Sequence, residues 1–255
     1  MPPHWSSQAP SSEDATPALL QAALSCFDAD NKAIKSGWGR ESRSFEHLGH
    51  RCFAKSESLR PGGLKGIARL LFPNSARIVH ESRMHGLACA ATSIVPRLIG
   101  LARAPRAFVL VTDFVEGTSL KTLFQETTGE LSFDRDVASS LVSGLARLHA
   151  AGIAHNDLHY GNIIVNAKHV WVVDFAMAGS IDPQDLAGGL GDLATLGRSL
   201  HEKIRLFTAL RWVLAYLSAR GVTDKAERRR LCERVAMLYR SQPFKRSGPD
   251  VWWRG

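Results

Sequence analysis

The sequence predicts an α+β protein of two lobes, with a strand-rich N-terminal third and a helix-rich remainder. Residues 33–55 contain short strand-like runs separated by glycine turns. Residues 107–112 are almost continuously apolar, which is typical of a strand buried on both faces. Beyond residue 117, apolar residues recur every three or four positions, as in helices that bury one face.

The N-terminal lobe is expected to follow a flexible tail and a short helix. Residues 1–16 are polar and rich in proline and serine, and Pro17 suits the first position of a helix that runs to Phe27. The other elements expected in this third are strands over 44–48, 51–55, 95–101 and 107–112, and helices over 64–72 and from residue 74 or 75 to 89.

The C-terminal lobe is predicted from helical spacing and one hairpin. The apolar positions Val137, Leu141, Val142, Leu145 and Leu148 define one buried helix face. A hairpin is expected over 162–165 and 169–173, and helices over 192–202, 204–220 and 224–240. The predicted domains are a tail with a short helix (1–28), an N-lobe (29–111), a hinge (112–117) and a C-lobe with a basic C-terminal helix and tail (118–255).

Composition narrows the classes of protein. The chain has 255 residues, of which 45% are hydrophobic, so folding can offset the lost chain entropy and bulk disorder is excluded. A count of 32 basic against 24 acidic residues gives a net charge of +8, which favours polyanionic partners without choosing among them. The four cysteines form no Cys-x-x-Cys pair, so reduced thiols are expected rather than a zinc site or a disulfide framework.

Targeting features point to the cytoplasm. No run of eighteen uncharged apolar residues is present, so no transmembrane helix is expected. The N-terminal residues lack the basic start and apolar middle of a signal peptide. We therefore expect a cytoplasmic protein.

The most informative segment joins the end of a helix to a hairpin. It contains His155 and Asp157, and Asn162 follows Asp157 by five positions. Asp174 comes twelve residues after Asn162, at the end of an apolar strand. Phosphoryl transfer needs a carboxylate that orients or deprotonates the attacking hydroxyl, and oxygen ligands that hold Mg²⁺ against the nucleotide phosphates. Asp157 suits the first role, and Asn162 and Asp174 suit the second.

This spacing resembles the protein-kinase-like signature, in which a His-x-Asp-x-x-x-x-Asn loop precedes the metal-binding Asp of Asp-Phe-Gly. Here the second motif reads Asp174-Phe175-Ala176. The resemblance implies ATP and Mg²⁺ as cofactors and a bracing role for His155. It also implies a cation on the α- and β-phosphates, for which Lys55 is the candidate, held by Glu81 on the next long helix. Taken alone, a lysine and a glutamate of this kind are more often solvated surface charges, and it is the ordered set of motifs that favours the functional interpretation.

Two further segments complete the resemblance. Residues 110–117 resemble the strand and hinge between kinase lobes, where the backbone of Asp113 and Val115 would pair with adenine. Asp192 opens a helix, so it suits a helix cap. By resemblance it is the buried acid that braces the catalytic-loop backbone, and the two roles are compatible.

The chain departs from regulated protein kinases at three places. No Gly-x-Gly-x-x-Gly is present, and the corresponding turn at 37–42 has two glycines, with Arg40 or Arg43 as candidate phosphate contacts or ordinary surface arginines. Asn156 replaces the arginine that meets an activation-loop phosphate. Only 18 positions separate Asp174 from Asp192, without Ala-Pro-Glu. These departures favour a small or glycan acceptor over a protein.

At a finer level the chain resembles the bacterial lipopolysaccharide-core kinases, the Kdo and heptose kinases. The segments that carry this resemblance are 60–64, 68–70, 81–83, 95–99, 192–200 and 210–217. The resemblance implies a cytoplasmic or inner-face enzyme of lipopolysaccharide biosynthesis that uses ATP and Mg²⁺ to phosphorylate a core sugar hydroxyl. Its partners would be a glycolipid acceptor and, at the basic run 225–234 or at Trp252-Trp253, an anionic membrane surface.

Three other functions compete with this one. A protein Ser/Thr or Tyr kinase, or a small-molecule kinase, keeps the fold and changes the acceptor. A non-catalytic nucleotide-binding pseudokinase is suggested by Ala176 and the sparse glycine turn. A nucleic-acid-binding module rests on charge alone, because no recognition motif accompanies the basic residues, and no nucleic-acid partner is expected.

Overall fold

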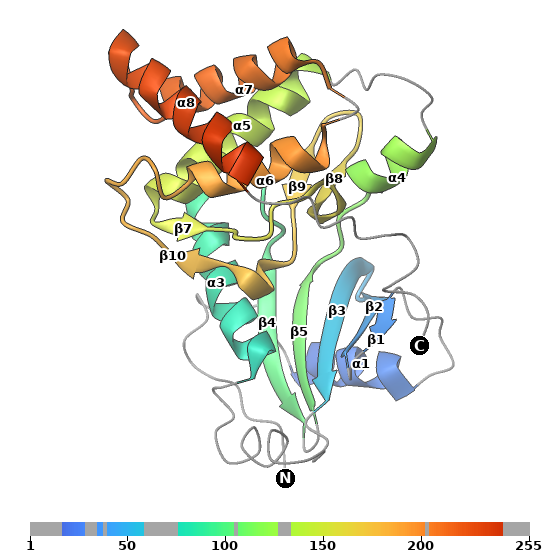
Figure 1. The fold of residues 1–255 in the computed structure, drawn as a ribbon. Coiled ribbons are helices and arrows are strands. Elements are labelled where there is room, and N and C mark those ends of the chain that lie inside the picture. Colours follow the sequence, from blue (N-terminus) through green and yellow to red (C-terminus); the bar gives the residue numbers. More distant parts are fainter. Residues whose placement is uncertain are drawn as a thin grey trace. The chain divides into compact units, whose positions relative to one another are not determined.

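The computed structural model describes residues 17–28, 35–37, 40–58, 76–104, 107–126, 134–201 and 204–241 (Figure 1). The chain divides into two compact units, one of residues 1–89 with 96–115 and the other of residues 90–95 with 116–255. The chain crosses between them three times, and the last crossing, at Val115 and Glu116, lies within residues 112–117, for which a hinge was predicted.

The first unit, within the described residues, is a five-stranded antiparallel sheet in the order β1-β2-β3-β5-β4. Its elements are α1 (Pro17–Asp28), β1 (Lys35–Gly37), β2 (Arg40–His47), β3 (His50–Ser58), α3 (Arg77–Ala91), β4 (Leu98–Ala104) and β5 (Ala107–Asp113). The turn between β2 and β3 has positive φ at Leu48 (51°) and Gly49 (78°), the twist that a two-residue hairpin needs.

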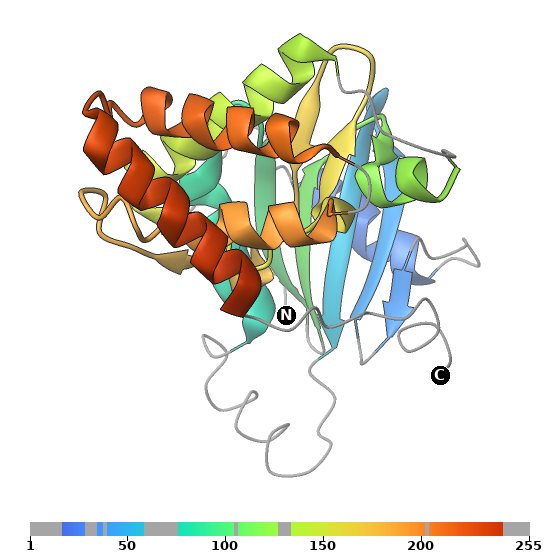
Figure 2. The ribbon, with the colours of Figure 1, turned by 45° about the horizontal axis from the view of Figure 1, so that its top comes forward.

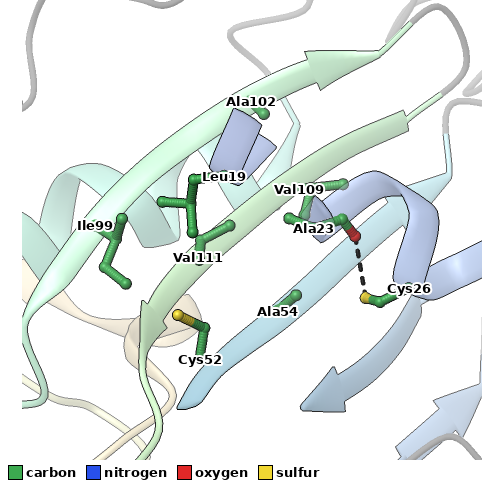
Figure 3. Packing of buried hydrophobic residues seen from close by; sticks show 9 residues of the cluster. All are labelled: Leu19, Ala23, Cys26, Cys52, Ala54, Ile99, Ala102, Val109 and Val111. Carbon is green, nitrogen blue, oxygen red and sulfur yellow. Dashed lines mark hydrogen bonds between the residues drawn. The ribbon is translucent and has the colours of Figure 1, made fainter. Parts of the chain in front are cut away.

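The two faces of this sheet bury different helices. On one face, α1 packs over the sheet in a cluster formed by Leu19, Ala23, Cys26, Cys52, Ala54, Ile99, Ala102, Val109 and Val111 (Figure 3). Successive side chains alternate across a strand, so Lys55 points to the opposite face from Ala54. There Ala76 and Ile78, at the start of α3, pack against Phe108 and Leu110. Strand β3 therefore presents Lys55 to the α3 side.

The second unit is mainly helical. Its helices are α4 (Leu120–Glu126), α5 (Arg135–Ala150), α6 (Leu190–Ser199), α7 (Leu206–Ala219) and α8 (Lys225–Ser241). Its short strands are β6 (Thr118–Ser119), β7 (Ile153–Ala154), β8 (Ile163–Val165), β9 (Val170–Val172) and β10 (Gly179–Ser180). Helix α7 contacts α5, and α8 contacts both α6 and α7 (Figure 2).

Helix α5 forms because its apolar residues share one face and its start is capped. The five apolar residues predicted to be inside, from Val137 to Leu148, are all buried. Asp134 accepts hydrogen bonds from the amides of Asp136 and Val137 at 2.7 and 3.4 Å, which satisfies two amides of the first turn. Gly152, at φ 78°, lets the chain reverse after the helix toward the predicted catalytic loop.

Most of the predicted elements are observed, with shifted ends. Strand β2 begins at Arg40 rather than residue 44, and α3 runs to Ala91 rather than 89. Some predicted features lie outside the described residues: the tail (1–16), the helix over 64–72, Trp38 and Gly39 of the glycine turn, and the Trp252-Trp253 anchor.

All four cysteines are free thiols. Among the described residues, we find no helix with the length and apolar character needed to cross a membrane.

Candidate active site

The loop that carries Asp157 lies between β7 and a 3-10 turn at Tyr160–Asn162. Asp192 of α6 holds its backbone. Oδ2 of Asp192 accepts the His155 amide at 2.6 Å, and Oδ1 accepts the Asn156 amide at 2.8 Å. Asn156 has a φ of 61°, the left-handed region that costs most residues free energy. The carboxylate of Asp192 therefore fixes the strained residue that directly precedes Asp157.

His155 joins this loop to the strand that leads to Asp174. Its side chain is buried, its Nε2 lies 3.1 Å from the carbonyl oxygen of Val173, and its ring packs 4.9 Å from that of Phe175. The amide of Asp157 donates to Nδ1 at 3.3 Å. Because Nδ1 accepts and a carbonyl faces Nε2, these contacts assign a neutral ring with its proton on Nε2. His155 therefore links the loop that carries Asp157 to the strand that precedes Asp174.

Asn162 is linked to both of its predicted neighbours. Its Nδ2 donates to the carbonyl oxygen of Asp157 at 3.0 Å, and its backbone carbonyl accepts the Val173 amide at 3.0 Å. The hairpin register pairs Ile163 with Val172, so Asn162 and Val173 are the next pair along. Asp174 follows immediately, in the left-handed region with a φ of 69°. The hairpin thus brings two oxygen-bearing side chains, twelve residues apart, to the same end.

The chemistry of this pair fits Mg²⁺. Carboxylate and amide oxygens are the ligands that hard divalent cations prefer, and Mg²⁺ commonly takes few protein ligands besides phosphate and water. The Asn162 amide donates through Nδ2 to the loop, which leaves its Oδ1 as the ligand atom. Within the described residues no group of three or more His, Cys, Asp or Glu side chains is placed to hold a metal.

Asp192 is buried, with 2% of its surface exposed, and it is a hydrogen-bonded carboxylate. Burial alone would raise the pKa of this carboxyl. The hydrogen bond from His149, the electrostatic influence of the His149 and His155 rings and the hydrogen bond from the His155 amide act the other way and hold the Asp192 pKa below its ordinary value. Asp192 is therefore an ionised brace for the loop. The structure places it early in α6, where its side chain serves the loop backbone rather than a cap of its own helix.

Lys55 and Glu81 form the corresponding pair in the first unit. Lys55 Nζ donates to both carboxylate oxygens of Glu81, at 2.7 and 2.8 Å, and only 14% and 5% of the two side chains are exposed. Strand β3 supplies the lysine and helix α3 the glutamate, as the sequence predicts. A shielded, two-oxygen ion pair of this kind is more than a solvated surface contact.

The predicted hinge residues lie at the end of β5. The Asp113 amide donates to the carbonyl of Arg97 at 3.0 Å, and the Asp113 carbonyl accepts from the Thr112 hydroxyl at 3.2 Å. The Asp113 carboxylate pairs with the Arg97 guanidinium at 3.0 and 3.2 Å. Val115 is half-buried and ends the first unit. An adenine contact at Asp113 and Val115 remains a prediction.

Of the two arginines considered for phosphate contact, Arg43 is held within the first unit. Its guanidinium donates to the Cys26 carbonyl of α1 at 2.7 Å and to Glu41 Oε1 at 2.6 and 2.8 Å. It also lies over the Phe27 ring. Arg40 lies 3.9 Å from the Glu57 carboxylate. These contacts tie the β2 strand to α1 and β3.

Three residues of this machinery were not predicted from the sequence. Glu57, two positions after Lys55, accepts the Ile78 amide at the start of α3 at 2.8 Å. His149, at the end of α5, contacts Asp192, and Tyr216 of α7 contacts His149. The period-two pattern of β3 would have placed Glu57 on the same face as Lys55. For Tyr216 no local pattern exists, because 67 residues separate it from His149.

The predicted site residues thus fall into two groups. In the second unit, His155, Asp157, Asn162 and Asp174 are joined through backbone and side-chain hydrogen bonds around one loop and one hairpin. In the first unit, Lys55 and Glu81 form an ion pair on the α3 side of the sheet.

Sequence comparison relates part of the chain to known proteins. The protein kinase domain family matches residues 73–192. Over 75 residues the chain is 36% identical to the probable serine/threonine-protein kinase PkwA of Thermomonospora curvata, a match that covers 29% of this chain and 10% of PkwA. Over 94 residues it is 32% identical to the KEOPS complex subunit Bud32 of Pyrococcus abyssi (strain GE5 / Orsay), covering 36% of this chain and 40% of Bud32. The chain therefore matches less than half the length of either relative.

A solved structure extends the likeness over most of the chain. WaaP, solved in complex with acyl carrier protein, superposes with a TM-score of 0.50 at 20% identity and covers 85% of this chain and 92% of WaaP. At that identity the likeness concerns the fold. With the kinase-domain match and the loop, hairpin and ion pair described above, it leads to one conclusion: the chain has a protein-kinase-like fold, within which residues 73–192 match the protein kinase domain family.

Proposed function

We propose that the chain is an ATP-dependent phosphotransferase that phosphorylates a sugar hydroxyl of the lipopolysaccharide core. The observation that carries the proposal is the loop anchored by Asp192, which presents Asp157 beside a hairpin ending in Asn162 and Asp174. A phosphotransferase needs these parts: a fixed carboxylate for the acceptor and oxygen ligands for the metal. The chain retains all of them, which argues against the pseudokinase alternative.

Each residue has a distinct role in this proposal. Asp157 orients the acceptor hydroxyl and accepts its proton as the oxygen attacks the γ-phosphorus of ATP; the bond from that phosphorus to the ADP oxygen breaks, and ADP leaves. The brace by His155 keeps the Asp157 backbone in place, so little reorganisation is needed at the moment of reaction. Lys55, held by Glu81, contacts the α- and β-phosphates. The backbone of Asp113 and Val115 binds adenine. Mg²⁺, held by Asn162 and Asp174, would neutralise charge on the phosphates.

The choice of a glycan acceptor rests on the short segment after Asp174. Only residues 175–191 lie between that aspartate and Asp192, and they contain a 3-10 turn and the two-residue strand β10, which pairs with β7. An extended peptide would need a longer platform on which to lie. Asn156, in place of an arginine, also leaves no partner for an activation-loop phosphate. The fold likeness to WaaP is consistent with this acceptor class.

The proposal also includes the location of the enzyme in the cell and its contact with a membrane. We place it in the cytoplasm, with peripheral contact to the anionic inner face of the inner membrane, where a glycolipid acceptor would be presented. Helix α8 carries six basic residues and two acidic ones, and two of its arginines pair with those acids, Arg229 with Glu233 and Arg230 with Glu227. The remaining charge supports electrostatic contact with anionic lipid. WaaP was solved with acyl carrier protein, so that protein is a second partner to test.

The test uses purified protein, Mg²⁺ and γ-labelled ATP with a cell-envelope extract that is separated into glycolipid and protein. Asp157→Asn removes the carboxylate but keeps the shape. Asp136→Asn makes the same change at an exposed position of α5 and serves as the control. The proposal expects label in glycolipid that is lost in Asp157→Asn and kept in Asp136→Asn. Label confined to protein would replace it with the protein-kinase alternative, and the absence of any label, with ATP still bound, with the pseudokinase.

A further inference from the structure

A chain of buried hydrogen bonds runs from α7 to the predicted catalytic loop. The Tyr216 hydroxyl lies 2.8 Å from Nδ1 of His149, and Nε2 of His149 lies 3.1 Å from Oδ2 of Asp192. Asp192 in turn accepts the amides of His155 and Asn156. The three linked side chains are almost completely buried, with exposed fractions of 0% for Tyr216 and His149 and 2% for Asp192.

The donors and acceptors of this chain favour one direction. The ionised carboxylate of Asp192 offers acceptors only, so Nε2 of His149 carries a proton and donates it to Asp192. In the neutral ring Nδ1 then has no proton and accepts the hydroxyl proton of Tyr216. The Tyr216 oxygen in turn accepts from Nη1 of Arg220 at 3.2 Å. Every proton in the chain then has one acceptor, which makes the network fully satisfied.

The packing around the chain leaves it no room to rearrange. A Cβ added at Gly189, just before α6, would overlap Nδ1 of His149 and lie 2.6 Å from the Tyr216 hydroxyl. The Tyr216 and His149 rings meet edge to face at 5.5 Å. Arg220 also donates through Nη2 to the carbonyl of Pro183 at 2.6 Å. That residue belongs to the segment between Asp174 and α6, so Arg220 ties this segment to the same network.

We propose that Tyr216 is a positioning residue for the transfer reaction: its hydroxyl holds His149 as the Nε2–H tautomer, and through it the carboxylate of Asp192 is oriented to fix the catalytic loop. The inference rests on the proposed phosphotransferase function. In this proposal Tyr216 touches neither substrate nor metal. Three successive hydrogen bonds, from Tyr216 to His149, from His149 to Asp192 and from Asp192 to the loop amides, connect it to the backbone that precedes Asp157.

Among the described residues, Asp192 of α6 and Tyr216 of α7 contact the ring nitrogens of His149. Arg220, directly after α7, contacts the Tyr216 hydroxyl, and the His155 amide shares the Asp192 carboxylate. A proton added to His149 would be attracted by Asp192 but would have to sit on Nδ1, against the hydroxyl proton of Tyr216. Removing that hydroxyl removes the opposing donor. Which ring nitrogens of His149 carry a proton therefore reports directly on what Tyr216 does.

The test compares Tyr216→Phe with Tyr239→Phe, a control that removes a hydroxyl from the other C-terminal tyrosine, on α8. The full-length variants are labelled with ¹⁵N at histidine, and the protonation of His149 is followed by NMR between about pH 6 and about pH 8. Exchange of the His155 and Asn156 amides is measured in the same samples. Turnover with γ-labelled ATP and the glycolipid fraction gives kcat and the KM for ATP.

In Tyr216→Phe we expect a larger fraction of His149 with a proton on Nδ1, faster exchange of the two loop amides, and a kcat lowered about tenfold with the KM for ATP within about twofold. Tyr239→Phe should leave all of these at wild-type values. An unchanged His149 spectrum and unchanged amide exchange in Tyr216→Phe would overturn the inference. If the wild-type protein transferred no phosphate, the proposed function would fail, while the NMR and exchange data would still decide whether Tyr216 positions the loop.

Discussion

Lys55 Nζ lies 2.7 and 2.8 Å from the two carboxylate oxygens of Glu81, in a pair that is largely shielded from water. Strand β3 and helix α3 are therefore joined by a charge-assisted contact before any nucleotide binds. If Lys55 serves the phosphates, Glu81 sets where its ammonium points. The pair is therefore the part of the first unit most directly open to test.

Glu81→Gln should lower the kcat/KM for ATP by about 10- to 100-fold, because the lysine ammonium loses the charge that orients it. Glu46→Gln, a matched change at an exposed position of β2, should leave the value near wild type. Steady-state kinetics with varied ATP decides the matter. Equal kinetics for the two variants would show that the ion pair supports the fold and not the reaction.

Glu57 should stabilise helix α3 from its first turn. It is 3% exposed and accepts the Ile78 amide, one helical turn before Glu81. Glu57→Ala removes this cap and should lower the free energy of unfolding by about 1–3 kcal/mol. Glu57→Gln keeps an acceptor oxygen and should lose less. Denaturant titration of both variants provides the measurement, and an alanine variant as stable as the glutamine variant would contradict the capping role.

Asp192→Ala should affect the loop and the fold together. It leaves two buried backbone amides without their acceptor and removes the partner of His149. We expect a loss of stability of about 2–5 kcal/mol and a fall in kcat of at least about 100-fold. Thermal unfolding and label transfer are measured beside Asp136→Ala, which removes an exposed carboxylate. Full activity in a folded Asp192→Ala protein would exclude the bracing role.

His85 should make the protein less stable in mild acid. Burial is the main cause that lowers its pKa from 6.5 to about 4; the charge of Lys55 lowers it further, and the contact with the Pro96 carbonyl, 2.7 Å from Nε2, opposes the shift. Between these pKa values the unfolded chain binds a proton that the folded chain does not. Stability is thus retained above about pH 6.5 and is lost as the pH falls toward 4.

The expected size of this effect is about 2 kcal/mol between pH 7 and pH 5. His85→Gln removes the titrating group and retains a donor for the Pro96 carbonyl. Between pH 7 and pH 5 its free energy of unfolding should therefore fall by about 2 kcal/mol less than that of the wild type. Denaturant titration at the two pH values compares the variants. Parallel pH dependence in wild type and His85→Gln would mean that other groups cause the loss.

The local parts of the fold were predicted well because their signals are local. The buried face of α5 follows from five apolar residues at helical spacing, and all five are buried. The β8–β9 hairpin follows from two short apolar runs around a turn. Element ends were less accurate, as at β2, which begins at Arg40, because pairing with β1 extends the strand beyond its own alternating pattern.

The sequence by itself determined the order of strands and helices and the spacing that brings Asp157, Asn162 and Asp174 to one hairpin, since a tight loop and a short hairpin leave few alternatives. Tertiary structure alone decided other supporting contacts: Glu57 meets α3 across 21 residues, and Tyr216 meets His149 across 67. The contacts of Asp192 with the loop, across 36 and 37 residues, were expected from the kinase resemblance and not from local spacing. The packing of the helices determines which polar groups meet, because a buried donor or acceptor needs a hydrogen-bond partner and packing decides which group lies within reach.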